Sequence, residues 1–294
     1  MKGNTLITGV TGNLGRLVLN NLLEEYSSDQ QLSILVRDIN KATDFKNIGI
    51  TVYVGDYNNY DSLVSAFKNI DNLYFVSGND IVNRTKQHEN VIGAAKEAGV
   101  KHVVYTSFIR ENETETSPIA RIAHSHLKTE NWLKNSGIDY TILKHTIYAD
   151  FIPMFLGENF LETGIAYLPA GEGKNSFVTR NDMAEVGAKI LTSLEAHKNK
   201  EYNIVNENTI SFRDIVSQIS EITGKPIQYI SPTQLEYIET LTKSGVPKDY
   251  IGMFTGFAEA FKQEEFIKTG TTIQSLIGRK PTSINEFLTQ VYQK

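Results

Sequence analysis

The sequence contains no cysteine among its 294 residues, and it has no apolar run long enough to cross a bilayer. The first absence excludes disulfide bonds, thiolate catalysis and metal or iron–sulfur sites with cysteine ligands. The chain also lacks a basic-then-apolar leader at its start, so we expect a cytoplasmic protein with no membrane partner. Its net charge of −5 offers no broad basic surface, and we therefore expect no nucleic-acid partner.

Three glycines at intervals of three residues follow a short apolar run near the start of the chain. Residues 6–7 are typical of a buried parallel strand, and an amphipathic helix is predicted at residues 13–26. Gly9 can adopt the backbone angles of a tight turn, Gly12 lets the main chain approach a diphosphate, and Gly15 lets the helix pack closely on the strand. The pattern predicts a turn that binds a dinucleotide.

The backbone amides at the start of this helix are the expected diphosphate contacts. They have no acceptor inside the helix and they lie at the positive end of its dipole, so they attract an anion. The predicted dinucleotide contacts of this turn are Gly9, Thr11, Gly12, Asn13 and Leu14.

A basic residue follows the second predicted strand. In dinucleotide folds this position holds either an acid that binds the ribose hydroxyls or a base that binds a 2′-phosphate. Arg37 stands there with Lys41 one turn away, and together they favour NADPH over NADH. Asp38 keeps NADH possible, because its carboxylate could bind a ribose instead.

Polar and small residues also follow the third and fourth predicted strands. Asp56 could accept a hydrogen bond from the adenine amino group with Tyr57 stacked beside it, or Asp56 could instead cap the helix that begins near residue 60. Ser77 and Gly78 follow the fourth strand, where a glycine again lets the backbone approach the cofactor. All four residues are expected cofactor contacts.

Successive strand–helix units indicate a Rossmann-type, doubly wound parallel sheet. The predicted strands are residues 6–7, 31–36, 51–54, 73–76, 102–105 and 140–143, with helices at 83–98 and 118–135 among them. Ser107 follows the fifth strand and falls, like the residues above, at the carboxyl edge of the sheet, where ligands of this fold bind. We therefore expect Ser107 to contact the cofactor.

Several motifs spread over both halves of the chain. They are Thr8-Gly9-Val10-Thr11-Gly12-Asn13-Leu14-Gly15, Val36-Arg37, Gly55-Asp56-Tyr57, Gly99-Val100-Lys101-His102, His126-Leu127-Lys128-Thr129-Glu130, Thr179-Arg180-Asn181-Asp182 and Tyr202-Asn203-Ile204-Val205. Together they resemble the NmrA-like group of atypical short-chain dehydrogenase/reductases. Within that group the chain is most similar to the triphenylmethane-dye reductase and type 2 NAD(P)H:quinone oxidoreductase branch.

The resemblance draws attention to a missing pair. Ordinary members of the superfamily carry Tyr-x-x-x-Lys on the helix after the fifth strand, where the tyrosine donates a proton and the lysine holds the nicotinamide ribose. This chain has no such pair there, and two registers could replace it: His124 with Lys128, or Ile122 with His126 anchored on Glu130. The two histidines are about 200° apart around a helix, so both cannot face the cofactor. We choose the register with His126.

His126 is therefore an expected catalytic residue and cofactor contact. It could hydrogen-bond the nicotinamide ribose or help protonate an acceptor. The alternative is a histidine that pairs with Glu130 one turn later and has no chemical role. We expect no metal site, because His124 and His126 point apart and His102 lies in a strand.

The segment after the sixth predicted strand is expected to pass near the nicotinamide. Relatives often carry Arg-Asn where this chain has Lys144-His145, and this departure puts those contacts in doubt. We expect Thr146 to contact the cofactor and Tyr148 to contact the acceptor as a second catalytic residue. Tyr148 could instead be a packed core tyrosine.

The absent tyrosine acid indicates the kind of acceptor. Reduction of a ketone needs a proton delivered with the hydride at a matched pKa. A cationic dye takes a hydride alone, and a reduced quinone can collect its proton from water. The sequence therefore favours an NADPH-dependent reductase, with NADH possible, that acts on quinones or similar small electron-poor aromatic acceptors. The alternative is a catalytically idle NADP(H)-binding redox sensor of the NmrA type.

The chain is expected to combine a dinucleotide-binding domain at residues 1–147 with a smaller α+β substrate subdomain at residues 148–294. The two are interleaved without a flexible linker, and a strand is predicted at residues 200–205 of the second. The sequence leaves open whether the chain forms a homodimer.

Two features of the second half carry further expectations. Asn181 or Asp182 is predicted to cap a helix at residues 183–194. An apolar stripe between Tyr250 and Phe261 has helical spacing and is typical of a core helix, although it could also roof the acceptor site or bury a partner.

Overall fold

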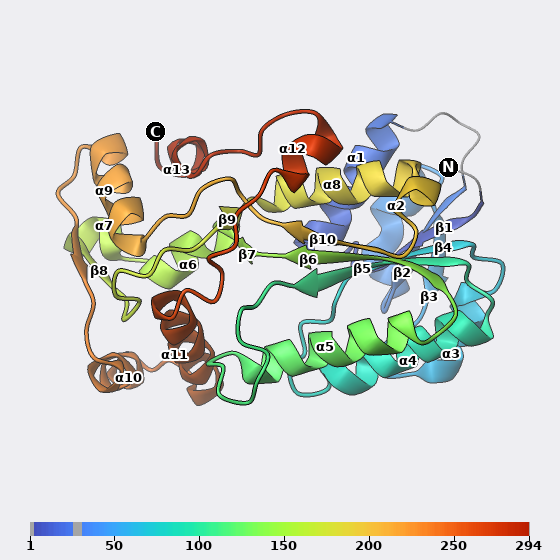
Figure 1. Cartoon of the computed structure of the whole chain (residues 1–294), viewed down its shortest axis with the longest axis horizontal. Helices are drawn as coiled ribbons and strands as arrows, with labels where there is room; N and C mark the ends of the chain where they lie inside the picture. The colour runs from blue at the N-terminus through green and yellow to red at the C-terminus, as the bar shows by residue number, and fades with distance from the viewer. Residues whose placement is uncertain (1–2, 26–30, 294) are drawn as a thin grey trace.

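A seven-stranded parallel sheet forms the centre of the computed structural model, which describes residues 3–25 and 31–293 (Figure 1). The strands are β1 (Thr5–Ile7), β2 (Leu32–Val36), β3 (Thr51–Val54), β4 (Asn72–Phe75), β5 (His102–Phe108), β6 (Asp139–His145) and β10 (Lys200–Ile204). Their order is β3-β2-β1-β4-β5-β6-β10, so the chain winds outward from β1 in one direction and then from β4 in the other. Ligands of such open sheets bind where the order reverses, at the carboxyl ends of β1 and β4.

Helices cover both faces of this sheet, which is why its inner strands are continuous apolar runs. The first face is covered by α3 (Tyr60–Phe67), α4 (Arg84–Glu97) and α5 (Ala120–Lys134), and the second by α1 (Asn13–Glu25) and α8 (Arg180–Thr192). Every residue of β2 and of β4 is buried between the two layers. The predicted Rossmann-type fold is confirmed. The predicted end of the first helix at residue 26 lies outside the described residues.

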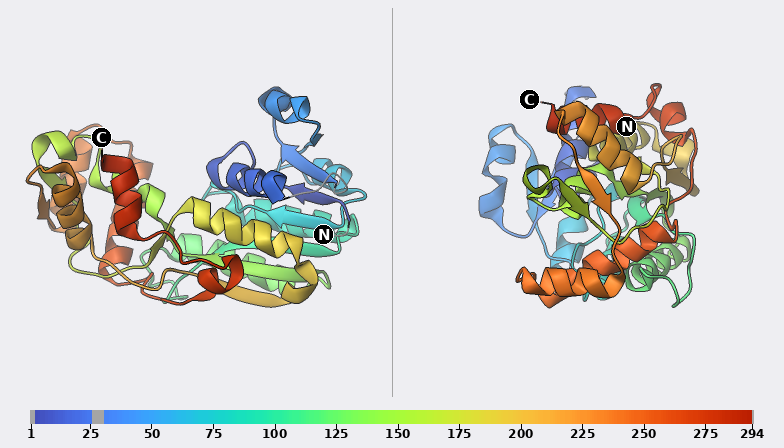
Figure 2. Two further views of the ribbon diagram at one scale, coloured as in Figure 1. Left: turned by 90° about the horizontal axis from the view of Figure 1, so that it is seen from above. Right: turned by 90° about the vertical axis from the view of Figure 1, so that its left-hand side faces the viewer.

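A second lobe lies beyond the carboxyl ends of the strands, as Figure 2 shows from two further directions. It contains the parallel pairs β7 (Ile147–Tyr148) with β9 (Phe177–Val178) and β8 (Ile165–Tyr167) with β11 (Gln228–Ile230). Its helices are α6 (Ile152–Leu156), α7 (Phe160–Thr163), α9 (Phe212–Thr223), α10 (Gln234–Lys243), α11 (Lys248–Lys262) and α13 (Ile284–Tyr292). No helix in the described part of the chain is long and apolar enough to cross a membrane.

The remaining short elements belong to the first lobe or to the junction. They are the 3-10 turns η1 (Ile39–Ala42), η2 (Ala149–Phe151) and η3 (Leu194–His197), and the helices α2 (Thr43–Asn47) and α12 (Thr272–Ile277). Two elements from residues 148–294, β10 and α8, pack within the first lobe. The proposed division at residues 147 and 148 therefore stays a prediction, with its parts interleaved as the sequence suggested.

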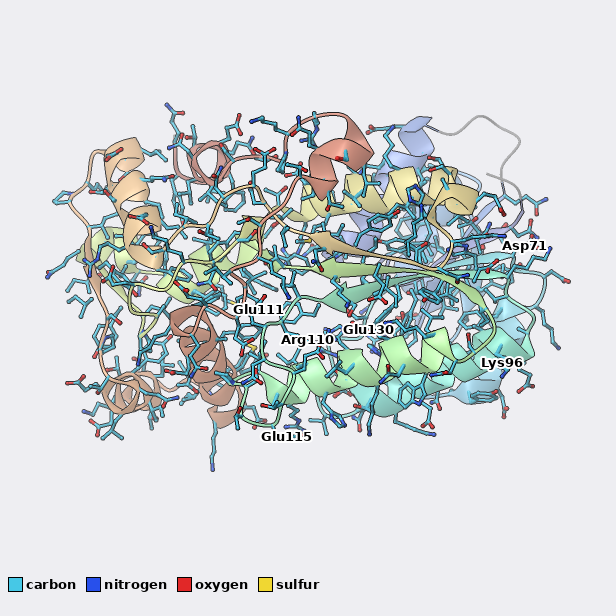
Figure 3. The ribbon with its side chains drawn as sticks, viewed as in Figure 1. Asp71, Lys96, Arg110, Glu111, Glu115 and Glu130 are labelled. Atoms are coloured by element: carbon cyan, nitrogen blue, oxygen red, sulfur yellow. The ribbon has the colours of Figure 1, made fainter. Side chains whose placement is uncertain are left out.

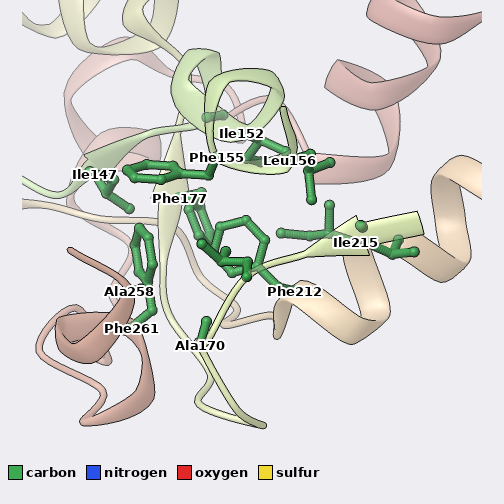
Figure 4. Close-up of a cluster of buried hydrophobic side chains, with 14 of the residues drawn as sticks. Ile147, Ile152, Phe155, Leu156, Ala170, Phe177, Phe212, Ile215, Ala258 and Phe261 are labelled. Atoms are coloured by element: carbon green, nitrogen blue, oxygen red, sulfur yellow. The ribbon is translucent and has the colours of Figure 1, made fainter. Parts of the chain in front are cut away.

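Phenylalanine rings form the core of the second lobe (Figure 4). The ring of Phe261 lies 5.0 Å from those of Phe155 and Phe212 and 5.6 Å from that of Phe266. Such pairs add about 0.5–1.5 kcal/mol each beyond the burial of their area. Phe261 ends the apolar stripe of α11, so this end of the stripe is core, whereas Tyr250 at its other end is 56% exposed.

Two predicted helix caps were wrong. Thr179, in an extended conformation, caps α8 and accepts a hydrogen bond from the amide of Asp182, so neither Asn181 nor Asp182 is the cap. The helix starts at Arg180, three residues before the predicted start, which moves Asp182 inside its first turn.

The helix α3 is capped by Asn59, whose side chain accepts from the amide of Ser62. Asp56, the residue considered for this role, accepts instead from the amide of Asn58 at 2.8 Å. The capping alternative for Asp56 is therefore wrong, while its expected contact with a cofactor stays a prediction.

Candidate functional site

The turn between β1 and α1 has no room for a side chain at two of its glycines. Gly9 has a φ of +69°, and a Cβ added there would lie 2.9 Å from the Cβ of Val76. A Cβ on Gly15 would lie 2.5 Å from the carbonyl oxygen of Gly9 and 2.7 Å from that of Thr8. These oxygens belong to the backbone, so Gly15 is what lets α1 start directly at the end of β1.

The amides that follow the turn differ in their availability. The amide of Gly12 donates to the carbonyl oxygen of Gly9 at 3.0 Å, which closes the turn. The amides of Asn13 and Leu14 belong to the first turn of α1 and have no acceptor within the helix. The side chain of Thr11 is exposed and that of Leu14 is buried, so Leu14 can offer a ligand its backbone. This arrangement suits a diphosphate.

Arg37 and Lys41 are exposed beside the carboxyl end of β2. The carboxylate of Asp38 accepts from the amide of Asn40 at 2.9 Å and caps η1. This bond uses one oxygen of the acid that was the alternative ribose ligand and leaves the other oxygen available. The charge of Arg37 reaches Tyr57 at the end of β3. The expected preference for a 2′-phosphate at this corner stays a prediction.

Tyr57 ties three strand ends together. Its hydroxyl shares its proton between Oγ1 of Thr8, at 2.6 Å, and the carbonyl oxygen of Val76, at 2.9 Å. Burial raises the pKa of this hydroxyl, so Tyr57 stays protonated. Its predicted stacking on an adenine stays a prediction, but the ring has a structural role whether or not a ligand is present.

The segment after β4 is held by side chains from two neighbouring elements. The amide of Ser77 donates to Oγ1 of Thr106 at 2.9 Å, and the amide of Gly78 donates to Nε2 of His88 at 3.0 Å. The carbonyl oxygen of Gly78 accepts from Nε of Arg84 at 2.5 Å. Both predicted contacts, Ser77 and Gly78, therefore lie on a loop with a fixed backbone.

The bond to Gly78 fixes the tautomer of His88. An amide can only donate, so Nε2 of His88 is unprotonated and its ring hydrogen lies on Nδ1. Nδ1 then donates to Oγ1 of Thr129 at 2.8 Å. Burial, assisted by the charge of Arg84, lowers the pKa of His88 to about 3. His88 is therefore neutral at physiological pH.

His126 in turn takes its tautomer from Tyr105. The hydroxyl of Tyr105 lies 2.7 Å from Nδ1 of His126 and 3.4 Å from the protonated Nδ1 of His88, so it donates to His126. His126 consequently carries its hydrogen on Nε2, and within the described ranges this nitrogen has no hydrogen-bond partner. Burial holds the pKa of His126 well below its usual value. His126 thus offers a neutral N–H to a ligand.

Glu130 does not pair with His126, contrary to the alternative considered above. Its carboxylate accepts two bonds from Arg110, at 2.9 and 3.1 Å, and one from the hydroxyl of Ser107. Lys144 lies 3.7 Å from the same carboxylate. Figure 3 shows Arg110 and Glu130 between the sheet and α5. The hydroxyl proton of Ser107 is used in its bond to Glu130. The expected contact of Ser107 with the cofactor stays a prediction.

Three polar residues at and after the end of β6 differ in their surroundings. Thr146 is buried and its hydroxyl donates to the carbonyl oxygen of Ser176 at 2.8 Å. His145 is also buried, neither ring nitrogen has a partner in the part of the chain described, and burial lowers its pKa to about 3. Tyr148 is half-buried, with the guanidinium of Arg180 4.8 Å from its ring centre. Burial raises the pKa of the Tyr148 hydroxyl to about 12, so this group is a hydrogen-bond donor but a weak acid.

Sequence reasoning missed Arg84, His88 and Tyr105. They come from α4 and β5. Arg84 and His88 hold the loop at Gly78, and the contacts of His88 and Tyr105 with α5 and with each other join residues 17–41 positions apart in the chain. Helical spacing indicates only that His88 and Arg84 share a face of α4. A buried network of this kind has no local sequence signal.

A concave region lies at the edge of the sheet opposite the candidate site. It has a volume of about 840 Å³ and is lined by the starts of β4, β5 and β6 and by η3. His102 lies there and hydrogen-bonds Thr141 at 2.9 Å. No group of three histidine or acidic side chains in residues 3–25 and 31–293 is arranged to hold a metal ion. Since parallel sheets bind ligands at their carboxyl edge, we place the functional site with His126 and Gly9.

Comparison with known proteins gives a consistent result. The model of the NmrA-like family matches residues 1–288. Quinone oxidoreductase 2 of Escherichia coli is 30% identical over 286 residues, 97% of this chain and 98% of its own, and its crystal structure with NADPH superposes with a TM-score of 0.90. Triphenylmethane reductase of Citrobacter sp., solved with NADP(H), is 35% identical, with a TM-score of 0.89 over 98% of this chain and 99% of its own.

Proposed function

The chain belongs to the NmrA-like family, and from this premise we propose that it is an NADPH-dependent reductase of quinones and related electron-poor aromatic acceptors. Similar proteins with solved structures bind NADPH or NADP(H), and their names describe reduction of quinones and of triphenylmethane dyes. The site described above supplies the physical reasons for extending this activity to the present chain.

The residues present fit NADPH. The amides of Asn13 and Leu14 would hold the diphosphate, because they combine free donors with the positive end of α1. A side chain at Gly15 would push α1 away from the carbonyl oxygens of Thr8 and Gly9, so this glycine keeps the first amides of α1 in place for that group. Arg37 would bind the 2′-phosphate, because its exposed guanidinium stands after β2 with Lys41 one turn away. When bound, NADPH supplies a hydride from its nicotinamide ring.

The side chains at the other end of the site can bind an acceptor but are poor sources of a proton. His126 presents Nε2–H, fixed by the bond from Tyr105, and can donate to a ribose hydroxyl or to an acceptor oxygen. Tyr148, with a pKa of about 12, can donate a hydrogen bond to an acceptor without giving up its proton. A quinone suits this site, because its reduced form can take its proton from water.

The observation that carries the proposal is the fixed, neutral His126 at the place where ordinary short-chain dehydrogenases have a lysine. A lysine there lowers the pKa of the neighbouring tyrosine acid. In the register chosen above, the uncharged imidazole has no such tyrosine to activate, because Ile122 would stand at that position. The site is therefore suited to hydride transfer without coupled proton transfer.

The test is oxidation of NADPH by purified protein mixed with a panel of acceptors in a stopped-flow instrument. We expect loss of dihydronicotinamide absorbance with 1,4-benzoquinone and 1,4-naphthoquinone, and no loss with simple ketones such as cyclohexanone. Bound NADPH that no acceptor oxidises would contradict the proposal and would favour the redox-sensor alternative.

A further inference from the structure

A buried cation, Arg84, begins α4 at the carboxyl edge of the sheet. The residue is 8% exposed, and its Nε donates to the carbonyl oxygen of Gly78. Over the described stretches 3–25 and 31–293, no carboxylate forms an ion pair with this guanidinium, and its two Nη groups have no hydrogen-bond partner. The acid whose charge acts on it is Asp80, which itself caps the turn before α4 through Val82 and Asn83.

Two properties of this position cost free energy. Burial removes the guanidinium from water, although an arginine remains charged at neutral pH. Arg84 is also the first residue of α4, where the helix dipole disfavours a cation, and the first turn of α4 holds no acid to compensate. A negatively charged group bound during function would offset both costs.

The neighbours of Arg84 belong to the acceptor end of the site. Its charge acts on Tyr105, His126 and Tyr148. Tyr105 lies on β5, which is two strands from β1 and therefore about 10 Å away at the usual strand spacing. The expected diphosphate donors stand at the end of β1 and already provide for that anion.

We propose that Arg84 binds the acceptor oxygen that becomes negative during reduction, and that it makes this enzyme selective for quinones over cationic dyes. The inference rests on the proposed function above and deepens it. Reduction of a neutral quinone transfers one hydride, two electrons and one hydrogen nucleus, from NADPH to the acceptor. NADPH is oxidised to NADP⁺, the quinone becomes a hydroquinone monoanion, and one proton from water completes the product. Negative charge therefore develops beside Arg84.

A cationic dye meets the opposite situation, because it brings a positive charge to a buried positive group before any reaction occurs. Nearby acids do not cancel that repulsion. Glu130 is bound by Arg110, and Asp150 lies 3.4 Å from Arg180 and accepts from its amide. The imidazoles of the site have lowered pKa values and contribute no charge of either sign at neutral pH.

Equilibrium binding gives a test that does not depend on turnover. The full-length protein, saturated with NADP⁺, is titrated with three probes: the anion of 2-hydroxy-1,4-naphthoquinone, neutral 1,4-naphthoquinone, and a cationic triphenylmethane dye. We expect the affinity to fall in that order. In Arg84→Met we expect the ratio of anion affinity to cation affinity to drop about tenfold to hundredfold, through weaker anion binding and tighter dye binding.

Three matched variants separate charge from structure. Arg84→Lys keeps the charge and should hold the ratio within about threefold of the wild-type value. Lys86→Met removes a cation from the same helix at a side chain that is 72% exposed, and should leave the ratio unchanged. Melting temperature and NADP⁺ affinity are measured for each variant, because Arg84 also holds the loop at Gly78.

Two results would overturn the inference. One is an unchanged affinity ratio in a folded Arg84→Met protein. The other is a weaker NADP⁺ affinity in Arg84→Met together with the same loss of affinity for all three probes. That result would assign Arg84 to the cofactor diphosphate. If the wild type reduces no acceptor, the proposed function fails, yet the order of probe affinities still decides the role of Arg84.

Discussion

The two ends of the candidate site are built differently. The end at β1 and β2 consists of backbone amides and exposed side chains, with Gly15 packed against the backbone and Arg37 open to solvent. The end at β5 and β6 consists of buried polar side chains: Tyr105 and His126 hydrogen-bond each other, and Arg84 holds the loop at Gly78. We propose that the first end binds the diphosphate that dinucleotide folds share and that the second end serves the acceptor.

This difference has an energetic consequence. Backbone donors at a helix terminus are free in any folded state, so the nucleotide end needs no further support. Buried polar groups are costly unless they are satisfied, so the acceptor end depends on long-range partners such as Glu130 with Arg110. Substitutions at the nucleotide end should therefore act mainly on cofactor affinity. Substitutions at the acceptor end should act mainly on stability and on reduction of the acceptor.

The largest effect is expected from Glu130→Gln. The neutral amide removes the buried counterion of Arg110 and leaves only the exposed Glu113, so the free energy of unfolding should fall by about 3–5 kcal/mol in urea denaturation. Glu113→Gln is the matched control, because Glu113 contacts the same guanidinium at 3.0 Å but is 55% exposed. It should cost less than about 1 kcal/mol. Equal losses in the two variants would contradict the distinction between buried and exposed partners.

Gly15→Ala tests the backbone-built end. Its Cβ would lie 2.5 Å from the carbonyl oxygen of Gly9, so α1 must shift, at a cost of about 2–3 kcal/mol in stability. NADPH affinity should weaken at least about tenfold in calorimetry. Gly252→Ala, in a helix and with open space around its Cβ position, should be neutral or stabilising. Unchanged NADPH affinity in Gly15→Ala would count against the turn as the diphosphate site.

The acid side of the stability profile tests the buried imidazoles. His145 has a folded pKa of about 3 against about 6.5 in the unfolded chain, so below pH 6.5 the unfolded state binds a proton that the folded state excludes. Stability is therefore lost as the pH falls from 6.5 towards 3. Between pH 7 and 5 the wild type should lose about 2 kcal/mol more than His145→Asn. His124→Asn, at a side chain that is 49% exposed, should follow the wild type, and identical profiles for all three would refute the assignment.

His126→Leu separates cofactor binding from acceptor chemistry. It removes the Nε2 donor, so kcat/KM for 1,4-naphthoquinone should fall about tenfold, the value of one lost hydrogen bond at the reacting centre. The matched variant His124→Leu alters an exposed position two residues earlier and should leave the kinetics unchanged. Wild-type kinetics in a folded His126→Leu protein would remove His126 from the mechanism.

The smallest effect is expected at the exposed corner of the nucleotide end. Arg37→Ala should weaken NADPH about fivefold and leave NADH almost unchanged, because the solvent-exposed guanidinium meets only the 2′-phosphate. Isothermal titration with both nucleotides measures the difference, with Lys46→Ala as an exposed control. Parallel losses for NADPH and NADH would overturn the assignment of Arg37.

The sheet could be predicted because it has local signals, and the same kind of signal underlies the predicted nucleotide end, whose contacts stay predictions. The glycine spacing, the apolar strands and the base at Arg37 lie within short stretches whose physical roles are fixed by backbone geometry. The caps at Thr179 and Asn59 were missed by two or three residues, since several polar residues could serve at each helix start.

The acceptor end could be predicted only in part. The chosen register on α5 places His126 at the cofactor, and this stays a prediction; His126 is buried, and its partner Tyr105 is 21 residues away in the chain. The expected pairing of His126 with Glu130 was an open alternative because helical spacing allowed it. Arg110, outside that helix, takes the carboxylate instead. Networks between distant elements are decided by tertiary packing, which spacing in the sequence does not encode.

We propose that one end of the site holds the nucleotide and the other end serves the acceptor. A crystal structure of the NADP⁺ complex would decide this. We expect the diphosphate on the amides of Asn13 and Leu14, and the nicotinamide beside Tyr105 and His126. A dinucleotide bound with its adenine at His126, or at the opposite edge of the sheet near His102, would contradict it.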